Sequence, residues 1–414
     1  MKKIVMCGGG TAGHIMPNIA LFPALKNKYQ IHYIGEPNSM EYGLVSKYPY
    51  ITYWSVTSVK FIRKFTLKNL AIPFKLYKAI MQCKKILKEI NPSVIFSKGG
   101  YVSVPVVIAG AMLHIPIVAH ESDYSIGLAN KIIYRKCSAM CFSFKPLALK
   151  YDKKGIYTGS PIRPTLSVYH PENMAKLGKF DEHKPNVLFV GGSLGAKAIN
   201  DVVQSKINTL TKRYNIVHIV GKGNMAPERK SNYIQLEFLN NIQDAFAWAD
   251  VVVSRAGSNV IFELLYLCKP MILVPLPKDV SRGDQILNAY DFEKNGYAKV
   301  LLQSELNEIT LSNTIEKVLQ DKAGMELKMK KANKDIGNNL IVEQIDKFAK
   351  KEWEDYTHSL FIEHLFDILN IVCYNTLYEN GCCTRYTIYP IIKRWNNHSK
   401  WDCQQIHNMH AYCL

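Results

Sequence analysis

The stretch that decides the fold is Gly8-Gly9-Gly10-Thr11-Ala12-Gly13-His14, or GGGTAGH. It follows a short apolar run at residues 4–7 and precedes an apolar-periodic segment at residues 15–25. This order predicts a strand, a glycine-rich turn and a helix start, which together open a βα unit. Glycines let the backbone approach a ligand closely, and a helix N-terminus presents unpaired N–H groups to a phosphate.

The motif ends in His14, which places an imidazole at the mouth of this phosphate cradle. A general base would be placed in the same way, because histidine exchanges a proton near neutral pH. A histidine that only caps the helix is the alternative interpretation of the same residue.

A second glycine-rich turn occurs at residues 191–196, GGSLGA. It again follows an apolar strand, at 187–190, and precedes a helical pattern that starts near Lys197. Because the spacing is far too long for a solenoid repeat, the two turns indicate two similar α/β domains.

Apolar strand-like runs alternate with helical patterns along most of the chain, which predicts doubly wound parallel sheets. The runs lie at residues 4–7, 31–34, 94–96, 117–119, 139–142 and 156–158, then 187–190, 216–220, 234–238, 251–254, 271–274 and 298–302, with closing helices at 305–345. We expect an N-terminal domain at 1–163, a linker at 164–185, a C-terminal domain at 186–350 and a tail at 351–414. Ligands of such sheets bind beyond the carboxyl ends of the strands, so the site is expected in the cleft between the domains.

The composition is that of a globular protein, with 48% apolar residues over 414 positions and a formal net charge of +18. A basic excess favours nucleic acid, an anionic membrane or an anionic substrate as partner. No zinc-finger spacing or aromatic-plus-basic RNA signature occurs, so nucleic acid is not the expected partner. No signal peptide is expected, and the apolar stretch 101–119 is interrupted by prolines, which predicts a helix and a buried strand instead of a membrane span.

The ten cysteines show no metal-ligand spacing. Those at 7, 83, 137, 141 and 268 lie in strand or helix patterns, which is typical of free buried thiols and of a reducing compartment. The tail holds the other five. A zinc site from Cys382, Cys383, Cys403 and His407 is conceivable there, but adjacent cysteines fit structural zinc poorly. A folded extension, a disordered tail and an aberrant reading-frame extension remain open for this segment.

Residues 60–88 contain nine basic residues and no acidic one. Apolar side chains interleave with them, at Phe61, Ile62, Phe65, Leu67, Leu70, Ile72, Phe74, Leu76 and Ile80. A basic, apolar surface segment suits an anionic bilayer. A solvated helix with its apolar face in the core would give a similar pattern.

The chain from Met1 to about Lys350 resembles the MurG family. The motifs that carry the resemblance occur in the family's order: GGGTAGH at Gly8, KGGYVSVP at Lys98, HESD at His120, GSPIR at Gly159, GGSLGA at Gly191, SRAGSNVIFE at Ser254 and GDQILNA at Gly283. The resemblance implies a GT-B fold and an inverting transfer of N-acetylglucosamine from UDP-GlcNAc to undecaprenyl-pyrophosphoryl-MurNAc-pentapeptide. That step serves peptidoglycan synthesis, and with it cell shape and division, at the cytoplasmic face of the cell membrane.

The resemblance also implies roles for individual residues. His14 would be the base, and Thr11, Ala12 and Gly13 would face the acceptor diphosphate or the donor sugar. Arg163 would face the leaving pyrophosphate, with an interdomain salt bridge as its alternative. Further donor contacts are implied for Ser193 at the phosphates, Leu239 at the uracil, Ser258, Asn259, Val260, Ile261 and Phe262 along the nucleoside site, Glu263 at the ribose, and Gln285 and Asn288 at the sugar.

Two positions depart from the family pattern. Ala12 stands where most relatives carry glycine, and Asp123 stands where many carry an asparagine that binds the donor sugar. A carboxylate can still accept a hydrogen bond from a sugar hydroxyl but cannot donate one. Tyr101 and Glu121 border the expected acceptor side, where buried hydrogen bonding is their alternative role.

Two other functions fit parts of this pattern. A UDP-GlcNAc 2-epimerase shares the architecture, and a non-catalytic membrane-docking subunit would share the basic segment. We expect no required cofactor, because no metal motif is seen, although a divalent cation could accompany the diphosphate. The expected partners are UDP-GlcNAc, the lipid-linked acceptor and an anionic membrane face.

Overall fold

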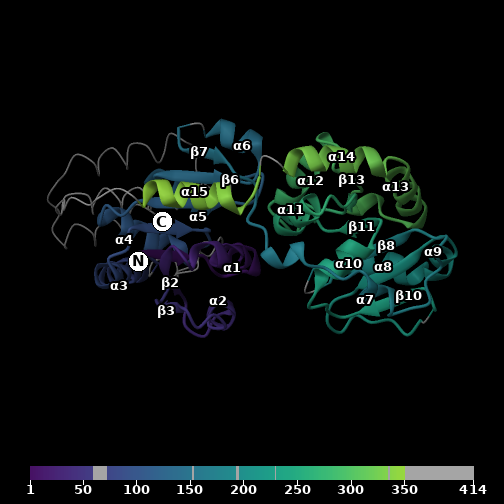
Figure 1. Cartoon of the computed structure of the whole chain (residues 1–414), viewed down its shortest axis with the longest axis horizontal. Helices are drawn as coiled ribbons and strands as arrows, with labels where there is room; N and C mark the ends of the chain where they lie inside the picture. The colour runs from purple at the N-terminus through teal and green to yellow at the C-terminus, as the bar shows by residue number, and fades with distance from the viewer. Residues whose placement is uncertain (59–71, 152, 193–194, 229, 334–335, 350–414) are drawn as a thin grey trace, which may run out of the picture.

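Two parallel β-sheets form the two halves of the protein in the computed structural model (Figure 1). The structure describes residues 1–58, 72–151, 153–192, 195–228, 230–333 and 336–349. The first sheet has seven strands in the order β3-β2-β1-β4-β5-β6-β7. They are β1 (Lys2–Cys7), β2 (Tyr29–Gly35), β3 (Ile51–Ser55), β4 (Val94–Ser97), β5 (Ile117–Glu121), β6 (Ala139–Phe142) and β7 (Gly155–Tyr157).

The second sheet has six strands in the order β10-β9-β8-β11-β12-β13. They are β8 (Asn186–Val190), β9 (Asn215–Ile219), β10 (Tyr233–Leu236), β11 (Val251–Ser254), β12 (Met271–Leu273) and β13 (Ala298–Val300). Every strand pair in both sheets is parallel, with Ile4 beside Ile31 and Val94 in the first sheet and Val252 beside Leu188 and Met271 in the second. The doubly wound fold class predicted from the alternating pattern is therefore confirmed.

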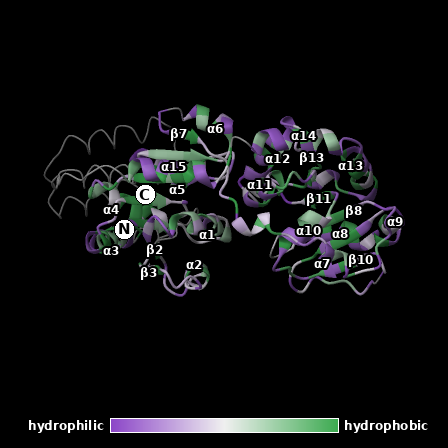
Figure 2. Ribbon diagram, viewed as in Figure 1, coloured by the Kyte–Doolittle hydropathy of each residue, from purple (hydrophilic) through white to green (hydrophobic). Residues whose placement is uncertain are grey.

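Helices connect the strands and cover both sheets, which explains why the strands are apolar on both faces. Figure 2 shows hydrophobic residues concentrated on the strands and hydrophilic residues on outer helices such as α13 and α14. The helices are α1 (Ala12–Leu25), α2 (Met40–Val45), α3 (Ile72–Ile90), α4 (Ser103–Met112), α5 (Leu128–Lys136), α6 (Lys145–Lys150), α7 (Glu172–Ala175), α8 (Lys197–Ser205), α9 (Ile207–Arg213), α10 (Ile242–Trp248), α11 (Ser258–Tyr266), α12 (Asp284–Lys294), α13 (Glu308–Gln320), α14 (Lys322–Ala332) and α15 (Asn338–Phe348).

The two glycine-rich turns follow the central strands β1 and β8, where the strand order of each sheet reverses. Such a switch point leaves a crevice at the carboxyl ends of the strands, because the flanking connections run to opposite faces. Gly10 has φ of +83°, and a side chain there would lie 2.5 Å from the ring of Tyr101. The first turn therefore needs glycine at this position for both its backbone conformation and its packing.

One strand was not predicted from the sequence. β3 pairs only with β2, at the edge of the first sheet. None of its five residues is fully buried, so it lacks the continuous apolar run by which the other strands were recognised. Edge strands are less apolar because one side of the strand faces away from the sheet.

Residues 164–185, predicted as a linker, pack against the C-terminal domain. Leu166 and Met174 are buried in its core, and the ring of Phe180 lies 4.9 Å from that of Trp248. The carboxylate of Asp244 accepts hydrogen bonds from the backbone of His170 and the side chain of Asn173. The prolines and charges of this stretch thus mark an irregular but docked segment.

Helix α15 belongs by sequence to the predicted C-terminal domain but packs on the N-terminal one (Figure 1). Its apolar face, with Ile341, Val342 and Ile345, joins the core around β1 and α1. The phenol of Tyr29 donates a hydrogen bond to Asp346 at 2.7 Å. The predicted C-terminal domain ends at residue 350, but the chain returns to the first domain before that point, at α15.

The stretch 101–119 forms helix α4 and strand β5, as predicted. Of the helices that the structure describes, none is long and apolar enough to cross a bilayer. The predictions for residues 59–71 in the basic segment and for the tail, including its zinc alternative, lie outside the described residues.

Candidate active site

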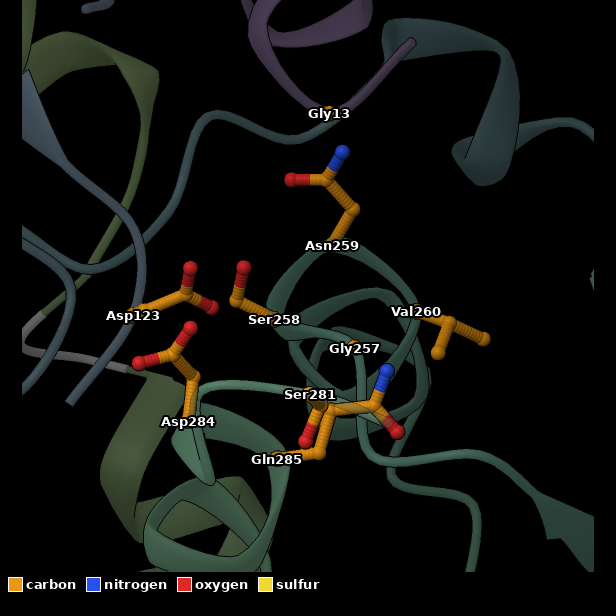
Figure 3. Close-up of a pocket in the computed structure, with 9 residues that line it drawn as sticks. All are labelled: Gly13, Asp123, Gly257, Ser258, Asn259, Val260, Ser281, Asp284 and Gln285. Atoms are coloured by element: carbon orange, nitrogen blue, oxygen red, sulfur yellow. The ribbon is translucent and has the colours of Figure 1, made fainter. Parts of the chain in front are cut away.

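A cavity of about 380 Å³ lies between the two domains (Figure 3). The N-terminal domain contributes Gly13 and Asp123 to its lining. The C-terminal domain contributes the larger share: Gly257, Ser258, Asn259, Val260, Ser281, Asp284 and Gln285. In the close-up, Asn259 points toward Gly13, and Asp123 faces Ser258 and Asp284 across the gap.

The C-terminal wall is built from the starts of two helices. α11 begins directly after Gly257 and α12 after Gly283, and neither helix has a side-chain N-cap. The first backbone N–H groups of each helix are therefore left without a capping acceptor, and the macrodipole favours an anion there. Helix starts with serine and asparagine side chains suit the polar groups of a nucleotide sugar.

His14 lies beside the cavity, one residue after Gly13. Its ring packs close to Gly100, and its Nδ1 atom is buried with no hydrogen-bond partner in the described part of the chain. Burial lowers the pKa of His14 to about 4, and the cations of Lys98 and Arg282 act in the same direction, while the backbone of Lys98 opposes them. The imidazole is therefore neutral at neutral pH and able to accept a proton.

The loop after β5 is organised around the carboxylate of Glu121. This buried group accepts hydrogen bonds from the backbone of Asp123, from the backbone of Gly127 and from the side chain of Asn130. Burial and the Asp123 carboxylate raise the pKa of Glu121, while Lys98 and the donors of Gly127 and Asn130 lower it. The side chain is thus committed to shaping the loop, which corresponds to its alternative role of buried hydrogen bonding.

Asn288 joins the two domains at the edge of the cavity. Its side-chain oxygen accepts from the backbone of Tyr124 at 2.8 Å, and its nitrogen donates to Asp123 and to the Ala256 carbonyl. The residue is fully buried. The amide of Asn288 therefore bonds to protein groups of both domains, and its contact with the donor sugar stays a prediction.

A second set of cross-cleft contacts involves Asp284 and Arg282. The hydroxyl of Ser125 donates to one oxygen of Asp284, and Arg282 lies 2.6 Å from the other. The same guanidinium is 3.8 Å from Asp123. Two carboxylates from opposite walls therefore share one cation at the rim of the cavity.

Arg163 and Glu263 form a bidentate ion pair between the domains. Nε donates to Oε1 at 2.7 Å and Nη2 to Oε2 at 2.8 Å. Burial raises the pKa of Glu263, and the arginine opposes that shift. The interdomain salt bridge expected as the alternative for Arg163 is present. The guanidinium and the carboxylate, each predicted to bind the donor, bond to one another in this structure.

The remaining predicted donor residues separate into two groups. Gln285 lines the cavity, and its side-chain oxygen accepts a hydrogen bond from the backbone of Leu276. Ile261 and Phe262, by contrast, are buried in the hydrophobic core, where Phe262 packs edge-on against Phe144. The helical period turns both side chains away from the cavity, and their donor contacts stay predictions.

The predicted acceptor side is more open. Thr11 and Ala12 are exposed beside Gly13. Tyr101 is half-buried and donates a hydrogen bond to Glu36 at 2.8 Å. Leu239 packs against the core next to β10, and Ser193 lies outside the described residues.

Four residues of the site were missed from the sequence: Gly257, Ser281, Arg282 and Asp284. Asp284 stands inside the motif GDQILNA, and Arg282 directly precedes it. A charged residue next to a glycine-marked helix start was the available signal. Among the described residues, no cluster of three or more metal-ligating side chains occurs.

Two Rossmann-like domains with a cavity between them form the GT-B architecture. The family models agree, since the Glycosyltransferase family 28 N-terminal domain matches residues 4–142 and its C-terminal domain matches residues 186–345. The chain belongs to the MurG family of these enzymes, as its full-length relatives show.

The relatives carry the name UDP-N-acetylglucosamine--N-acetylmuramyl-(pentapeptide) pyrophosphoryl-undecaprenol N-acetylglucosamine transferase. One from Clostridium botulinum is 44% identical over 356 residues, which cover 84% of this chain and 100% of the relative. One from Clostridium tetani is 44% identical over 353 residues, or 98% of its length. The crystal structure of Acinetobacter baumannii MurG, 25% identical, superposes with a TM-score of 0.66 over 84% of this chain and 100% of that one.

Proposed function

We propose that this chain transfers N-acetylglucosamine from UDP-N-acetylglucosamine to the N-acetylmuramyl-(pentapeptide) pyrophosphoryl-undecaprenol lipid, which converts lipid I to lipid II in peptidoglycan synthesis. The observation that carries the proposal is the cavity that joins Gly13, next to His14, to the first turns of α11 and α12. It sets a neutral imidazole beside a site with hydroxyl, amide and helix N-terminal donors. Full-length relatives named for this transfer support the choice of substrates.

The reaction needs a proton acceptor on the N-terminal wall. An acceptor-sugar hydroxyl attacks C1 of the donor sugar, a new C1–O bond forms, and the bond from C1 to the phosphate oxygen breaks with inversion. His14 takes the hydroxyl proton as the bond forms. A neutral imidazole suits this step, and the anionic diphosphates that arrive with both substrates raise its basicity.

The leaving UDP needs charge stabilisation on the C-terminal wall. The N–H groups at the starts of α11 and α12 supply it, and Arg163 adds a guanidinium at the domain boundary. For Arg163 to reach the diphosphate, its ion pair with Glu263 must open. Ribose hydroxyls would then replace the guanidinium on the Glu263 carboxylate.

The decisive experiment measures UDP release from UDP-GlcNAc with and without the lipid acceptor. The proposal expects UDP release that depends on the acceptor, together with a disaccharide-bearing lipid product. A 2-epimerase would instead convert UDP-GlcNAc to its C2 epimer without the lipid, and a docking subunit would leave UDP-GlcNAc unchanged, so analysis of the sugar product separates these two.

We propose that the protein docks peripherally on an anionic membrane face through α3. In the described part of the basic segment, Leu76 and Ile80 are buried in the core, so only part of its apolar set is at the surface. Phe74 is 83% exposed, and Tyr77 and Met81 are 43% and 41% exposed. Lys75, Lys78, Lys85 and Lys88 share that exposed surface. Aromatic and basic side chains together suit a lipid headgroup region.

We also propose that turnover needs no resident cofactor. Backbone N–H groups and Arg163 can stabilise the diphosphate without a metal ion. Assays after EDTA treatment, with and without added Mg²⁺, test this proposal. Loss of turnover that only a divalent cation restores would contradict it.

A further inference from the structure

Lys98 is a buried cation that the proposed reaction does not use. It directly follows β4, at the start of the turn, and is only 1% exposed. Its Nζ atom donates a hydrogen bond to the hydroxyl of Ser122 at 2.6 Å. A lysine is almost never fully buried without a reason, because removing its charge from water is costly.

The turn that carries Lys98 supports the glycine-rich loop and the base. A side chain at Gly8 would lie 3.0 Å from the Lys98 Cβ, and one at Gly100 would lie 3.1 Å from the imidazole of His14. The backbone N–H of Lys98 donates to the Cys7 carbonyl at 2.9 Å. The backbone of Lys98 therefore belongs to the turn that packs against the glycine-rich loop and the ring of His14.

The other end of the side chain reaches the loop that crosses the cleft. Ser122 lies between Glu121, which organises this loop, and Asp123, which lines the cavity and bonds to Asn288. The next two residues also contact the C-terminal domain, at Asn288 and Asp284. Lys98 thus connects the turn that packs against His14 to the loop whose residues contact the C-terminal domain.

We propose that Lys98 is a positioning residue for the transfer reaction. Its buried ammonium group fixes the loop of residues 121–125 that crosses the cleft, and it places a positive charge near His14. The inference rests on the proposed role of His14 as the base. It deepens that role, because the charge would keep the imidazole neutral until an anionic substrate binds.

The charges around the two groups fit this role. His14 faces the cations of Lys98 and Arg282, and both lower its pKa. Lys98 faces Glu121 and Asp123, which favour the ammonium form, while burial lowers its pKa to about 8. Burial, and to a smaller extent the same cation, lower the pKa of His120, which bonds to the Gly159 carbonyl. At neutral pH the lysine is therefore mainly charged and both histidines are neutral.

The first test follows the titration of His14 by NMR in the full chain with labelled histidine and no substrate. Lys98→Met removes the charge at similar volume, and we expect the midpoint of His14 to rise by about one pH unit. Ser122→Ala keeps the ammonium and should leave the midpoint near that of the wild type. The spectrum of His14→Gln identifies the signal.

This measurement does not depend on turnover, so it separates the inference from the proposed function. A folded Lys98→Met protein whose His14 titrates as in the wild type would overturn the electrostatic role. Melting temperatures of the variants establish that they are folded.

The second test addresses the loop and holds even if Lys98→Met does not fold. Ser122→Ala should weaken UDP-GlcNAc binding about fivefold in calorimetry, the effect of one lost hydrogen bond. Ser143→Ala is the matched control, because the buried Ser143 hydroxyl has no hydrogen-bond partner in the described residues. Equal affinity in Ser122→Ala and the wild type would overturn the role of Lys98 in fixing the loop.

Discussion

The two walls of the cleft differ in where they place charge. The N-terminal wall gives the cavity only Gly13 and Asp123, but has the buried Lys98 and Glu121 and the half-buried His14 nearby. The C-terminal wall gives it seven residues, most of them small or polar, at the starts of two helices. In the proposed reaction, the first wall controls a proton, and the second holds a neutral sugar and its phosphates by hydrogen bonds.

This difference follows from what comes after the first strand of each sheet. In the N-terminal domain the glycine turn continues into a histidine whose ring is pressed against a second glycine turn at Gly99 and Gly100. In the C-terminal domain the lining comes from later helices, α11 and α12. Similar sheets therefore place different chemistry at their switch points, and substitutions on the two walls should have separable effects.

The largest effect is expected from His14→Ala. Turnover should fall about 10²–10⁴-fold, because a general base acts in the transition state, while UDP affinity stays close to that of the wild type. Steady-state kinetics and calorimetry with UDP measure the two quantities. His183→Ala, an exposed histidine, serves as the control. Unchanged turnover would remove His14 as the base, and a large loss of UDP affinity would erase the distinction between the walls.

Glu263→Ala should act on the opposite wall. We expect UDP binding to weaken by about 1.5–3 kcal/mol, the range for a hydrogen bond to a charged group. Calorimetry with UDP is the measurement. Glu316→Ala breaks another arginine–glutamate pair, with Arg213, far from the cavity, and should leave UDP affinity unaltered. If Glu263→Ala binds UDP as the wild type does, the carboxylate serves only its ion pair with Arg163.

The sequence predicted much of the fold because most strands are buried on both faces and so carry continuous apolar runs. It missed β3, whose residues are partly exposed, and the return of α15 to the first domain, since an amphipathic helix does not specify its partner. His14, the proposed base, and the lining residues Ser258, Asn259, Val260 and Gln285 stand in glycine-marked motifs. The pairing of Arg163 with Glu263 depends on how two domains meet, which no local pattern records.

The histidines of the two halves also predict an acid-sensitive stability. Burial lowers the pKa of His14 to about 4 and that of His218, in the second domain, to about 3. The unfolded chain has a pKa near ~6.5 at these groups and binds more protons below that value. The unfolding free energy should therefore be highest above pH ~6.5 and decline as pH falls toward 4, by up to about 3 kcal/mol from His14.

Denaturant titrations between pH 4.5 and 8 check this prediction for the wild type and for His14→Gln, which cannot take up the proton. The variant should show a shallower decline, because one buried histidine no longer opposes folding in acid. Parallel pH profiles for the two proteins would contradict a lowered pKa of His14 in the folded protein.

The outer surfaces should differ in membrane binding. Replacing Lys75, Lys78 and Lys85 on α3 with glutamine should reduce pelleting with anionic liposomes severalfold at low salt, because surface attraction grows with basic charge and is screened by salt. Glutamine at Lys317, Lys330 and Lys331 removes the same charge from exposed positions of α13 and α14. Equal losses in both triple variants would mean that net charge, not α3, drives binding.

The smallest effect is expected from deletion of residues 353–414. Both sheets and α15 are complete before residue 350, and relatives named for the transfer are covered end to end by 84% of this chain. Activity and melting temperature should therefore stay close to those of the full chain.

Apolar segments such as residues 360–372 could still dock on a domain, in which case deletion would expose a patch and promote aggregation. A truncated protein that is soluble and binds UDP but is inactive toward the lipid acceptor would overturn this expectation. Because UDP binding belongs to the C-terminal wall, that outcome would assign the tail to the acceptor side of the cleft or to the membrane.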